Sequence, residues 1–322
     1  MQSSKLQLKV KSLGNIDFKA CRDAFGEALL ELGKKNKDVV VVSADLAEST
    51  RSLEFGKKYP SRFFEVGVAE QNMAGIAAGL ALEGLLPFIC SFAVFSPGRN
   101  WEQIRVSVCY NKANVKIVSS HAGLNVGEDG ATHQALEDIA LMRVLPNMTV
   151  IAPCDYLETQ KAVLAAAKLK GPVYIRYGRE KTPVITSKQS KFQIGKADIL
   201  RQGKDVTIIA CGPMVYEALQ AAAELAKQKI SVEVINCHTI KPIDKATIIK
   251  SVKKTKKIVT IEEHQVNGGL GSAVAEVLSQ NCPVPMKIIG MPDKFGESGT
   301  GRQLLDKYNL NSKGIIDVIK KF

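Results

Sequence analysis

The stretch 39-VVVVSAD-45 opens with four consecutive valines and ends in a short polar segment. Valine is branched at Cβ and favours strands, and a short continuous apolar run is typical of a strand buried on both faces. Both faces of a parallel sheet are covered by helices, so this stretch predicts an α/β fold. In open sheets of this kind, ligands bind beyond the carboxyl ends of the strands. The loops that follow such runs are therefore where a functional site is expected.

Similar apolar runs recur along the first half of the chain. We predict further strands at 85–92, 115–121, 148–153 and 172–177. Helical patterns separate these runs, at 22–35, 69–84, 100–112 and 155–170. Asp155, with Glu158 three residues later, has the spacing of a helix capping box, and Gly171-Pro172 ends that helix.

A polar segment at 180–203 interrupts this alternation, and we interpret it as a linker between two α/β domains. The predicted domains are residues 12–185 and 186–322, each with a mostly parallel sheet flanked by helices. In the second domain the expected strands are 205–212, 230–237, 257–264 and 286–292. The expected helices of that domain are 214–228 and 270–280.

Composition excludes several classes of protein. The 322 residues are 45% hydrophobic and 24% charged, as in globular proteins. No run reaches the roughly 18 apolar residues that a membrane-spanning helix needs, and the first residues, MQSSKLQLKVKSLGN, lack an apolar signal core. We therefore expect a cytoplasmic protein with no membrane partner.

The seven cysteines are odd in number and contain no Cys-x-x-Cys, which predicts reduced, packed thiols rather than disulfides or a zinc site. The net charge of +12 comes from scattered lysines and one dense run, 250-KSVKKTKK-257. Because no nucleic-acid-binding motif accompanies it, we interpret the charge as a solvated basic surface or as attraction for anionic sugar phosphates. Nucleic acid is not an expected partner.

Two segments concentrate the residues that could carry chemistry. In 65-EVGVAEQNMAGIAAGLALEG-84, a strand turns into a helix of small residues with Glu70 in its first turn, where a carboxylate could simply complement the helix dipole. In 119-SSHAGLNVGEDGATHQALED-138, His121, Asp129 and His133 follow a strand end among several glycines. Glycine lets a backbone bend tightly and approach a ligand, so this loop is a candidate binding site.

Four motifs occur in a characteristic order: 43-SADLAEST-50, 65-EVGVAEQN-72, 127-GEDGATHQ-134 and 261-IEEHQVNGGLGSAVAE-276. Through them the chain resembles the transketolase branch of the thiamine diphosphate enzymes. The resemblance covers nearly the whole chain but only the C-terminal half of a transketolase. It implies a pyrimidine-binding domain followed by a transketolase C-terminal domain.

The resemblance implies a set of cofactor contacts. The residue matching Glu70 binds the aminopyrimidine ring of thiamine diphosphate and promotes its activation by proton transfer. Phe92 and Phe95 match aromatic residues that line the ring's pocket, and Asp45 matches a residue near the cofactor. Larger transketolases carry a tyrosine shortly afterwards, where this chain has 96-SPG-98. The resemblance therefore assigns no residue to the third wall of the pocket.

The substrate contacts implied by the resemblance lie in the histidine loop. The residue matching His121 contacts the sugar phosphate, the one matching Asp129 accepts a hydrogen bond from a substrate hydroxyl, and the one matching His133 lies against the reacting carbonyl. Histidine transfers protons near neutral pH, and a carboxylate orients a polyol, so both residue types suit this chemistry. We expect Glu70, Asp129 and His133 to be the catalytic residues.

Phosphate contacts are assigned by the same resemblance to Arg22, Ser49 and Arg179. The planar fork of arginine suits phosphate recognition. Either Arg176 or Arg179 could be the second arginine, and spacing favours Arg179. In the second domain, Gly268, Gly269 and Gly271 could cradle an anion ahead of a helix, and His238 and His264 are interpreted as structural.

One expected feature of a thiamine diphosphate enzyme is missing from the sequence. The Gly-Asp-Gly motif that, with a later asparagine, binds the diphosphate through a divalent metal does not occur. The chain therefore resembles one subunit of a split transketolase and should itself contribute no metal ligands. An N-terminal subunit would supply the diphosphate site and Mg²⁺, with the cofactor at the interface. A two-fold heterotetramer is the expected assembly.

The predicted reaction is reversible transfer of a two-carbon ketol group from a ketose phosphate to an aldose phosphate. Beta subunits of 2-oxo acid dehydrogenases resemble the Glu70 region, but their substrates do not require the His121, Asp129 and His133 loop. Deoxyxylulose phosphate synthase shares much of that loop but normally carries both halves in one chain. A non-catalytic interaction subunit that kept the fold is the remaining alternative.

Overall fold

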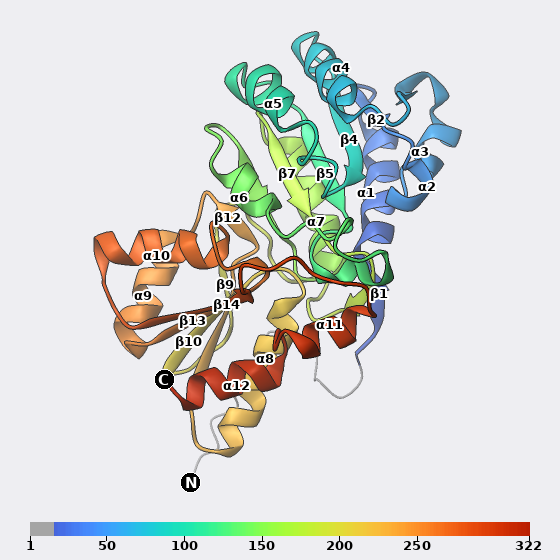
Figure 1. Cartoon of the computed structure of the whole chain (residues 1–322). Coiled ribbons are helices and arrows are strands. Elements are labelled where there is room, and N and C mark those ends of the chain that lie inside the picture. The colour runs from blue at the N-terminus through green and yellow to red at the C-terminus, as the bar shows by residue number, and fades with distance from the viewer. Residues whose placement is uncertain (1–15) are drawn as a thin grey trace.

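The valine run forms strand β2 (Val39–Ser43), which is buried over its whole length in a seven-stranded sheet. The computed structural model describes residues 16–322, and Figure 1 shows this sheet in its upper half. Neighbouring strands pair in parallel except at one edge, where β12 is antiparallel to β6. The strand order is β12 (Thr239–Lys241), β6 (Thr149–Ile151), β7 (Val173–Arg176), β5 (Lys116–Ser120), β4 (Leu86–Phe92), β2 and β3 (Phe63–Glu65).

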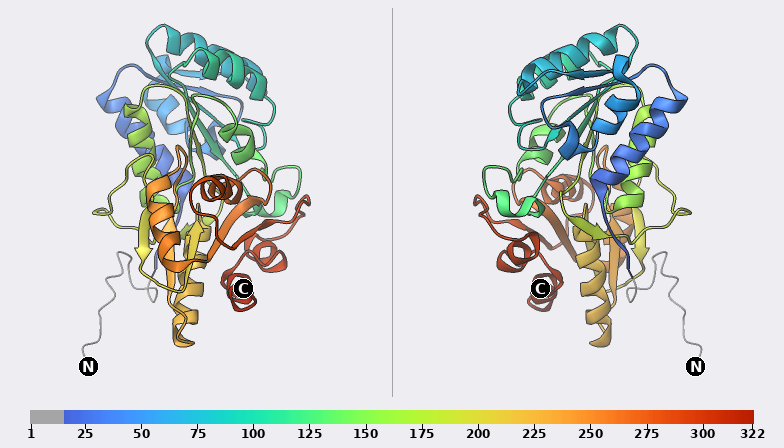
Figure 2. Two further views of the ribbon diagram at one scale, coloured as in Figure 1. Left: turned by 90° about the vertical axis from the view of Figure 1, so that its left-hand side faces the viewer. Right: turned by 90° about the vertical axis from the view of Figure 1, so that its right-hand side faces the viewer.

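Helices cover both faces of this sheet (Figure 2). On one face, α1 (Cys21–Lys35) and α7 (Tyr156–Lys168) bury Phe25, Leu29 and Ala162 against the strands. On the other face, α4 (Glu70–Leu82) buries Met73 and Ala77, whose small neighbours allow close packing. The shorter helices of this unit are α2 (Ala47–Thr50), α3 (Leu53–Lys58), α5 (Trp101–Gln103) and α6 (Asp138–Arg143).

The second unit contains a five-stranded sheet in which only β9 is antiparallel to its neighbour. Its strand order is β14 (Met286–Met291), β13 (Ile258–Gln265), β10 (Val206–Ala210), β11 (Val232–Asn236) and β9 (Asp198–Arg201). Its helices are α8 (Met214–Lys227), α9 (Lys245–Thr255), α10 (Leu270–Asn281), α11 (Gly301–Lys307) and α12 (Ser312–Lys320). The predicted α/β class with parallel-rich sheets is therefore confirmed.

The linker predicted at 180–203 is only partly correct. Its first residues form β8 (Lys181–Pro183), which pairs with β1 (Phe18–Ala20), and its last residues form β9. The sequence pattern does not predict these short polar strands, because their pairing partners are distant in the chain. The boundary after residue 185 stays a prediction, and residues 12–15 of the first predicted domain lie outside the described residues.

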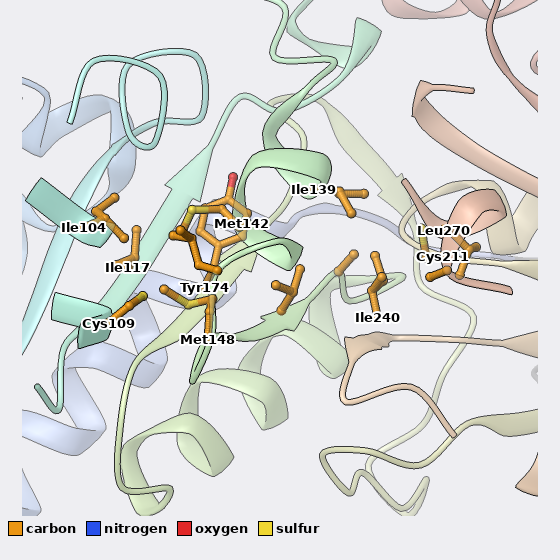
Figure 3. Close-up of a cluster of buried hydrophobic side chains, with 14 of the residues drawn as sticks. Ile104, Cys109, Ile117, Ile139, Met142, Met148, Tyr174, Cys211, Ile240 and Leu270 are labelled. Carbon is orange, nitrogen blue, oxygen red and sulfur yellow. The ribbon is translucent and has the colours of Figure 1, made fainter. Parts of the chain in front are cut away.

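A large apolar cluster spans the two units. Strand β12 belongs to the second predicted domain in the sequence, yet it forms an edge of the seven-stranded sheet of the first unit. Figure 3 shows Met142 and Tyr174 of the first unit in the same buried cluster as Cys211 and Leu270 of the second. The expected packed thiols are confirmed: all seven cysteines are free, and only Cys282 is partly exposed.

The helix expected at 100–112 is irregular. After α5, residues Ile104–Tyr110 adopt a π-helical conformation, with Ile104, Val108 and Cys109 buried. Spacings of four and five residues on one face suit the wider π turn better than the α-helical period. Among residues 16–322, none of the helices has the length and apolar character needed to cross a membrane.

Asp155 caps α7, but its arrangement differs from a capping box. Its carboxylate accepts the Glu158 backbone N–H at 2.8 Å and both the N–H and the hydroxyl of Thr186, at 2.6 and 2.8 Å. The Glu158 carboxylate turns instead to the backbone N–H of Cys154, at 2.7 Å. This fully buried cap therefore anchors the segment that leads into the second unit.

Replacing Asp155 with alanine should lower the free energy of unfolding by about 2–4 kcal/mol, because buried N–H groups on two segments lose their acceptor. Thr300→Ala is the matched control, since Thr300 caps the exposed N-terminus of α11 and forms a capping box with Gln303, three residues later. The control should cost about 1 kcal/mol in denaturant unfolding. Equal losses would show that Asp155 is only a local cap.

Candidate functional site

Most of the candidate residues lie at or beyond the carboxyl ends of the adjacent strands β3, β2, β4, β5 and β7, and Arg22 lies in the first turn of α1. Strands β2, β4 and β5 are parallel neighbours, and Phe92 and Ser120 are paired across β4 and β5. Parallel pairing brings the loops after each strand to the same edge of the sheet. As a result, residues that are far apart in the chain approach one another.

Four rings form the centre of this edge. His121 stacks on Phe92, with ring centroids 3.7 Å apart and planes inclined by 21°. Phe95 lies 5.9 Å from Phe92 at 18°, and His133 meets the edge of Phe95 at 5.5 Å. The two predicted histidines and the two predicted phenylalanines are thus brought together.

His121 is held in an unusual position. Its backbone is left-handed, with φ of 59°, and only 2% of the residue is exposed. Its Nδ1 lies 2.8 Å from the Ser120 hydroxyl. Burial, reinforced by the nearby cations Arg22 and Arg179, lowers the pKa of His121 to about 3. The ring is therefore neutral at physiological pH.

A group of cations lies beside the rings. Arg22 donates to the backbone carbonyl of Ser49 at 3.4 Å, while its buried Nε has no hydrogen-bond partner among the described residues. Burial and the neighbouring Arg51 lower the pKa of Arg22 from its usual value. Arg179 donates to the carbonyl of Val126 at 3.1 Å. Crowded cations with an unused donor favour the binding of an anion.

Asp129 and His133 occupy the mouth of the site. Asp129 is exposed and lies 3.6 Å from Arg179, a distance at which the pair is loosely associated. His133 is half-buried, and its Nδ1 lies 2.9 Å from the Thr132 hydroxyl. Both side chains remain accessible to a ligand.

The two candidate arginines differ in their partners. Arg176 is 5% exposed, and its Nε lies 2.7 Å from the fully buried carboxylate of Asp138. It also donates to the carbonyl of Glu263 at 3.2 Å. Arg176 therefore joins the two units, and Arg179 is the arginine available at the site.

The second unit supports the histidine loop directly. The Glu263 carboxylate accepts the backbone N–H of Asn125 at 2.5 Å, and burial raises the pKa of Glu263 to about 7. A Cβ at Gly123 would lie 2.6 Å from Glu263 Cδ, and φ at Gly123 is +77°. Glycine is therefore required where the loop crosses this side chain.

Glu70 begins α4 and is 3% exposed. Its carboxylate lies 3.0 Å from the guanidinium of Arg99, and the amide of Asn100 donates to its backbone carbonyl at 3.1 Å. A hollow of about 800 Å³ borders Glu70 and Arg99, lined otherwise by residues 68, 69, 71 and 72. The sequence contains no signal that the Arg99 side chain would reach Glu70.

Arg99 links Glu70 to the rings, because its guanidinium carbon lies 4.1 Å from the centroid of Phe95. Asp45 lies two residues after the end of β2, and its backbone is left-handed, with φ of 60°. Its backbone N–H donates to the Glu65 carboxylate at 2.6 Å. In the departure at 96–98, a Cβ at Gly98 would lie 1.9 Å from the carbonyl oxygen of Val94. The turn therefore requires glycine at position 98.

The anion cradle that Gly268, Gly269 and Gly271 could have formed is already filled by a side chain of the protein. The backbone N–H groups of Leu270 and Gly271 donate to the buried Glu262 carboxylate at 2.6 and 2.8 Å. A Cβ at Gly269 would lie 2.1 Å from the same carboxylate. The glycines serve internal packing and leave no room for an external anion.

Both histidines of the second domain have internal contacts. His238 stacks on Phe192 with centroids 4.3 Å apart, and His264 Nε2 accepts the backbone N–H of Ala140 at 3.3 Å. These contacts agree with their interpretation as structural residues.

Residues 18–184 match the transketolase pyrimidine-binding domain, and residues 195–315 match the transketolase C-terminal domain. The chain belongs to the transketolase family. This membership confirms the resemblance carried by the four motifs, and it implies dependence on thiamine diphosphate.

The transketolase relatives include proteins of the same length. The chain is 50% identical to "Putative transketolase C-terminal section" of Methanocaldococcus jannaschii, covering 92% of this chain and 94% of the relative. It is 44% identical to 6-deoxy-6-sulfo-D-fructose transketolase subunit SqwH of Clostridium sp. strain MSTE9, covering 92% of each.

A solved structure matches over almost the whole chain. It is described as a split gene transketolase in an inactive beta4 tetramer, with a TM-score of 0.86 and 46% identity. The match covers 94% of this chain and 97% of that one. The chain is therefore a C-terminal subunit of the split-transketolase type.

The His121 imidazole should stay neutral from pH 8 to about pH 5, because burial and the neighbouring arginines oppose protonation. Nuclear magnetic resonance titration can test this, with the His121 signal assigned by its loss in His121→Gln. Between about pH 6.5 and 3 the unfolded chain binds the extra proton, so the stability contributed by this neutral ring falls as pH is lowered. A titration midpoint near 6.5 would contradict the buried, cation-flanked geometry.

Proposed function

We propose that this chain is the catalytic C-terminal subunit of a split transketolase. With an N-terminal subunit, it transfers a two-carbon ketol group reversibly from a ketose phosphate to an aldose phosphate. The observation that carries the proposal is a row of residues at one sheet edge, which are in contact from Glu70 to the two histidines and are flanked by Arg22 and Arg179. Glu70 contacts Arg99, Arg99 lies over Phe95, and the phenylalanine–histidine rings lead to Arg22 and Arg179.

The residues at one end of this row fit the aminopyrimidine ring of thiamine diphosphate. Glu70 offers a buried carboxyl at the edge of a hollow, and Phe95 offers an aromatic face backed by Phe92. When bound, the cofactor supplies the carbon nucleophile that accepts the two-carbon unit. Glu70 would bind the ring edge, and Phe92 and Phe95 would hold the ring in place and exclude water. Asp45 is proposed to lie near the cofactor.

The central residues suit the sugar. Asp129 would accept a hydrogen bond from a substrate hydroxyl, and His133 would move a proton at the reacting carbonyl and its hydroxyl. His121 acts differently because its ring is neutral and its Nδ1 is engaged by Ser120. We assign it a positioning contact to the sugar phosphate through its other ring nitrogen.

The cations at the other end would bind the terminal oxyanion. Arg22 has an unused buried Nε, Arg179 borders Asp129, and Ser49 lies against Arg22. We propose phosphate as the natural group. One relative is named for 6-deoxy-6-sulfo-D-fructose, which ends in a sulfonate, so the identity of the oxyanion needs a direct test.

The remaining half of the site is assigned to a partner. We propose that an N-terminal subunit binds the diphosphate through Mg²⁺ and that two copies of each subunit form a two-fold heterotetramer in the cytoplasm. A related structure is described as an inactive beta4 tetramer. That description supports self-association of such subunits and a need for a second polypeptide.

Phosphate should raise the melting temperature of the subunit, and Arg22→Gln or Arg179→Gln should weaken phosphate binding about tenfold to a hundredfold, because a charge-assisted hydrogen bond is lost. Thermal shift titrations with phosphate and sulfate measure the effect. Arg105→Gln is the matched control, since Arg105 is exposed on the π-helical segment and the charge change is the same. Equal weakening by the control would indicate non-specific screening.

Ketol transfer from xylulose phosphate to ribose phosphate should require both this chain and a diphosphate-binding subunit, with thiamine diphosphate and Mg²⁺ present. Glu70→Ala should reduce the rate of the assembled enzyme by about a hundredfold or more. Glu83→Ala, an exposed residue at the end of the same helix, serves as control.

Unchanged activity of Glu70→Ala would remove the catalytic assignment and favour a non-catalytic subunit. Decarboxylation of pyruvate in place of ketol transfer would favour a 2-oxo acid dehydrogenase or deoxyxylulose phosphate synthase reaction.

A further inference from the structure

Arg99 makes two contacts with the residues proposed to hold the cofactor. Its Nη1 lies 3.0 Å from Glu70 Oε1, and its guanidinium carbon lies 4.1 Å from the centre of the Phe95 ring. The guanidinium is planar, carries N–H donors and stacks on aromatic faces. It therefore meets a carboxylate at its edge and an aromatic ring at its face.

An aminopyrimidine ring needs the same two partners. It is also planar, and under the proposed function it would place its edge against Glu70 and its face against Phe95. The two groups cannot use the same carboxylate edge and ring face together. We propose that Arg99 takes the place of the aminopyrimidine ring in the subunit without cofactor and swings away when the ring binds. This inference rests on the proposed function of Glu70 and Phe95.

The backbone around Arg99 is fixed, so only its side chain can make this movement. On one side, Gly98 packs so closely that a Cβ would lie 1.9 Å from the Val94 carbonyl oxygen. On the other, the Asn100 amide donates to the Glu70 carbonyl at 3.1 Å and to the Ser96 hydroxyl at 3.2 Å.

Space for the movement is available beside the side chain. Arg99 is 49% exposed, whereas the Glu70 side chain is 4% exposed, so the arginine is the mobile partner of the pair. The hollow of about 800 Å³ that it borders is lined by the polar residues Gln71 and Asn72 as well as by Val68 and Ala69. A displaced guanidinium would keep its hydration there.

Two functions follow from this arrangement. In the subunit without bound cofactor, Arg99 compensates the charge of Glu70 and covers the ring of Phe95. It also competes with the cofactor ring, which lowers the affinity of an incomplete site. Arg99 is thus a positioning residue that acts through Glu70, and binding is favoured only when the partner adds its own contacts.

The test measures binding of thiamine diphosphate to the two-subunit enzyme by calorimetry. Arg99→Ala should tighten the dissociation constant by about tenfold, because an ion pair and a cation–π contact no longer oppose the ring. Arg99→Lys should lie between the two, since lysine keeps the charge but lacks the planar group. Arg105→Ala, which alters charge elsewhere, should leave binding unchanged.

The same variants can be titrated without the partner, using free hydroxymethyl-aminopyrimidine, the ring moiety of thiamine, as the probe. Arg99→Ala should again bind more tightly than the unsubstituted chain. Weaker or equal binding by Arg99→Ala in both measurements would overturn the inference and make Arg99 a permanent support for Glu70.

Glu70→Gln separates this inference from the proposed function. If Glu70→Gln weakens cofactor binding and Arg99→Ala does not tighten it, only the displacement by Arg99 fails. If Glu70→Gln leaves cofactor binding unchanged, the assignment of Glu70 to the cofactor fails, and the inference fails with it.

Discussion

Parallel pairing of β2, β4 and β5 is the constraint on which the rest of the site depends. It brings three loops that are far apart in the chain to one edge of the sheet. The rings of Phe92 and His121 can stack only because adjacent strands end at the same level. Arg179 lies near them because it follows β7, which pairs in parallel with β5, whereas Arg22 comes from the first turn of α1. A site built in this way takes its functional groups from loops that a rigid sheet positions.

The second unit determines the shape of this edge as well as its stability. Arg176 and Asp138 of the first unit form a buried ion pair, and Arg176 reaches across the seam to the carbonyl of Glu263. Removing either member of the ion pair would leave a charge buried without compensation. From the other side of the seam, Glu263 binds the backbone of the histidine loop at Asn125. The loop is therefore fixed by contacts with a strand more than a hundred residues away, which explains why both units belong to one subunit.

The site is electrostatically asymmetric. One end combines Arg22, Arg179 and a neutral histidine, so it favours anions without supplying a proton from His121. The other end holds the buried carboxyl of Glu70, which is paired with Arg99. This asymmetry suits the proposed ketol transfer, in which one end of the site would hold an anionic sugar and the reacting bonds would lie toward the other end.

Local sequence determined the elements whose signals are local. The valine run gave a buried strand, Asp155 gave a helix cap, and the order of four motifs identified the family because the residues of each motif are close together in the chain. Tertiary structure alone decided features that depend on distant partners: β12 completes the first sheet, Glu262 fills the glycine cradle, and Asp138 withdraws Arg176 from the site. The contact between Arg99 and Glu70 belongs to the same group, because a flexible side chain reaches a residue 29 positions away only after two elements have packed together.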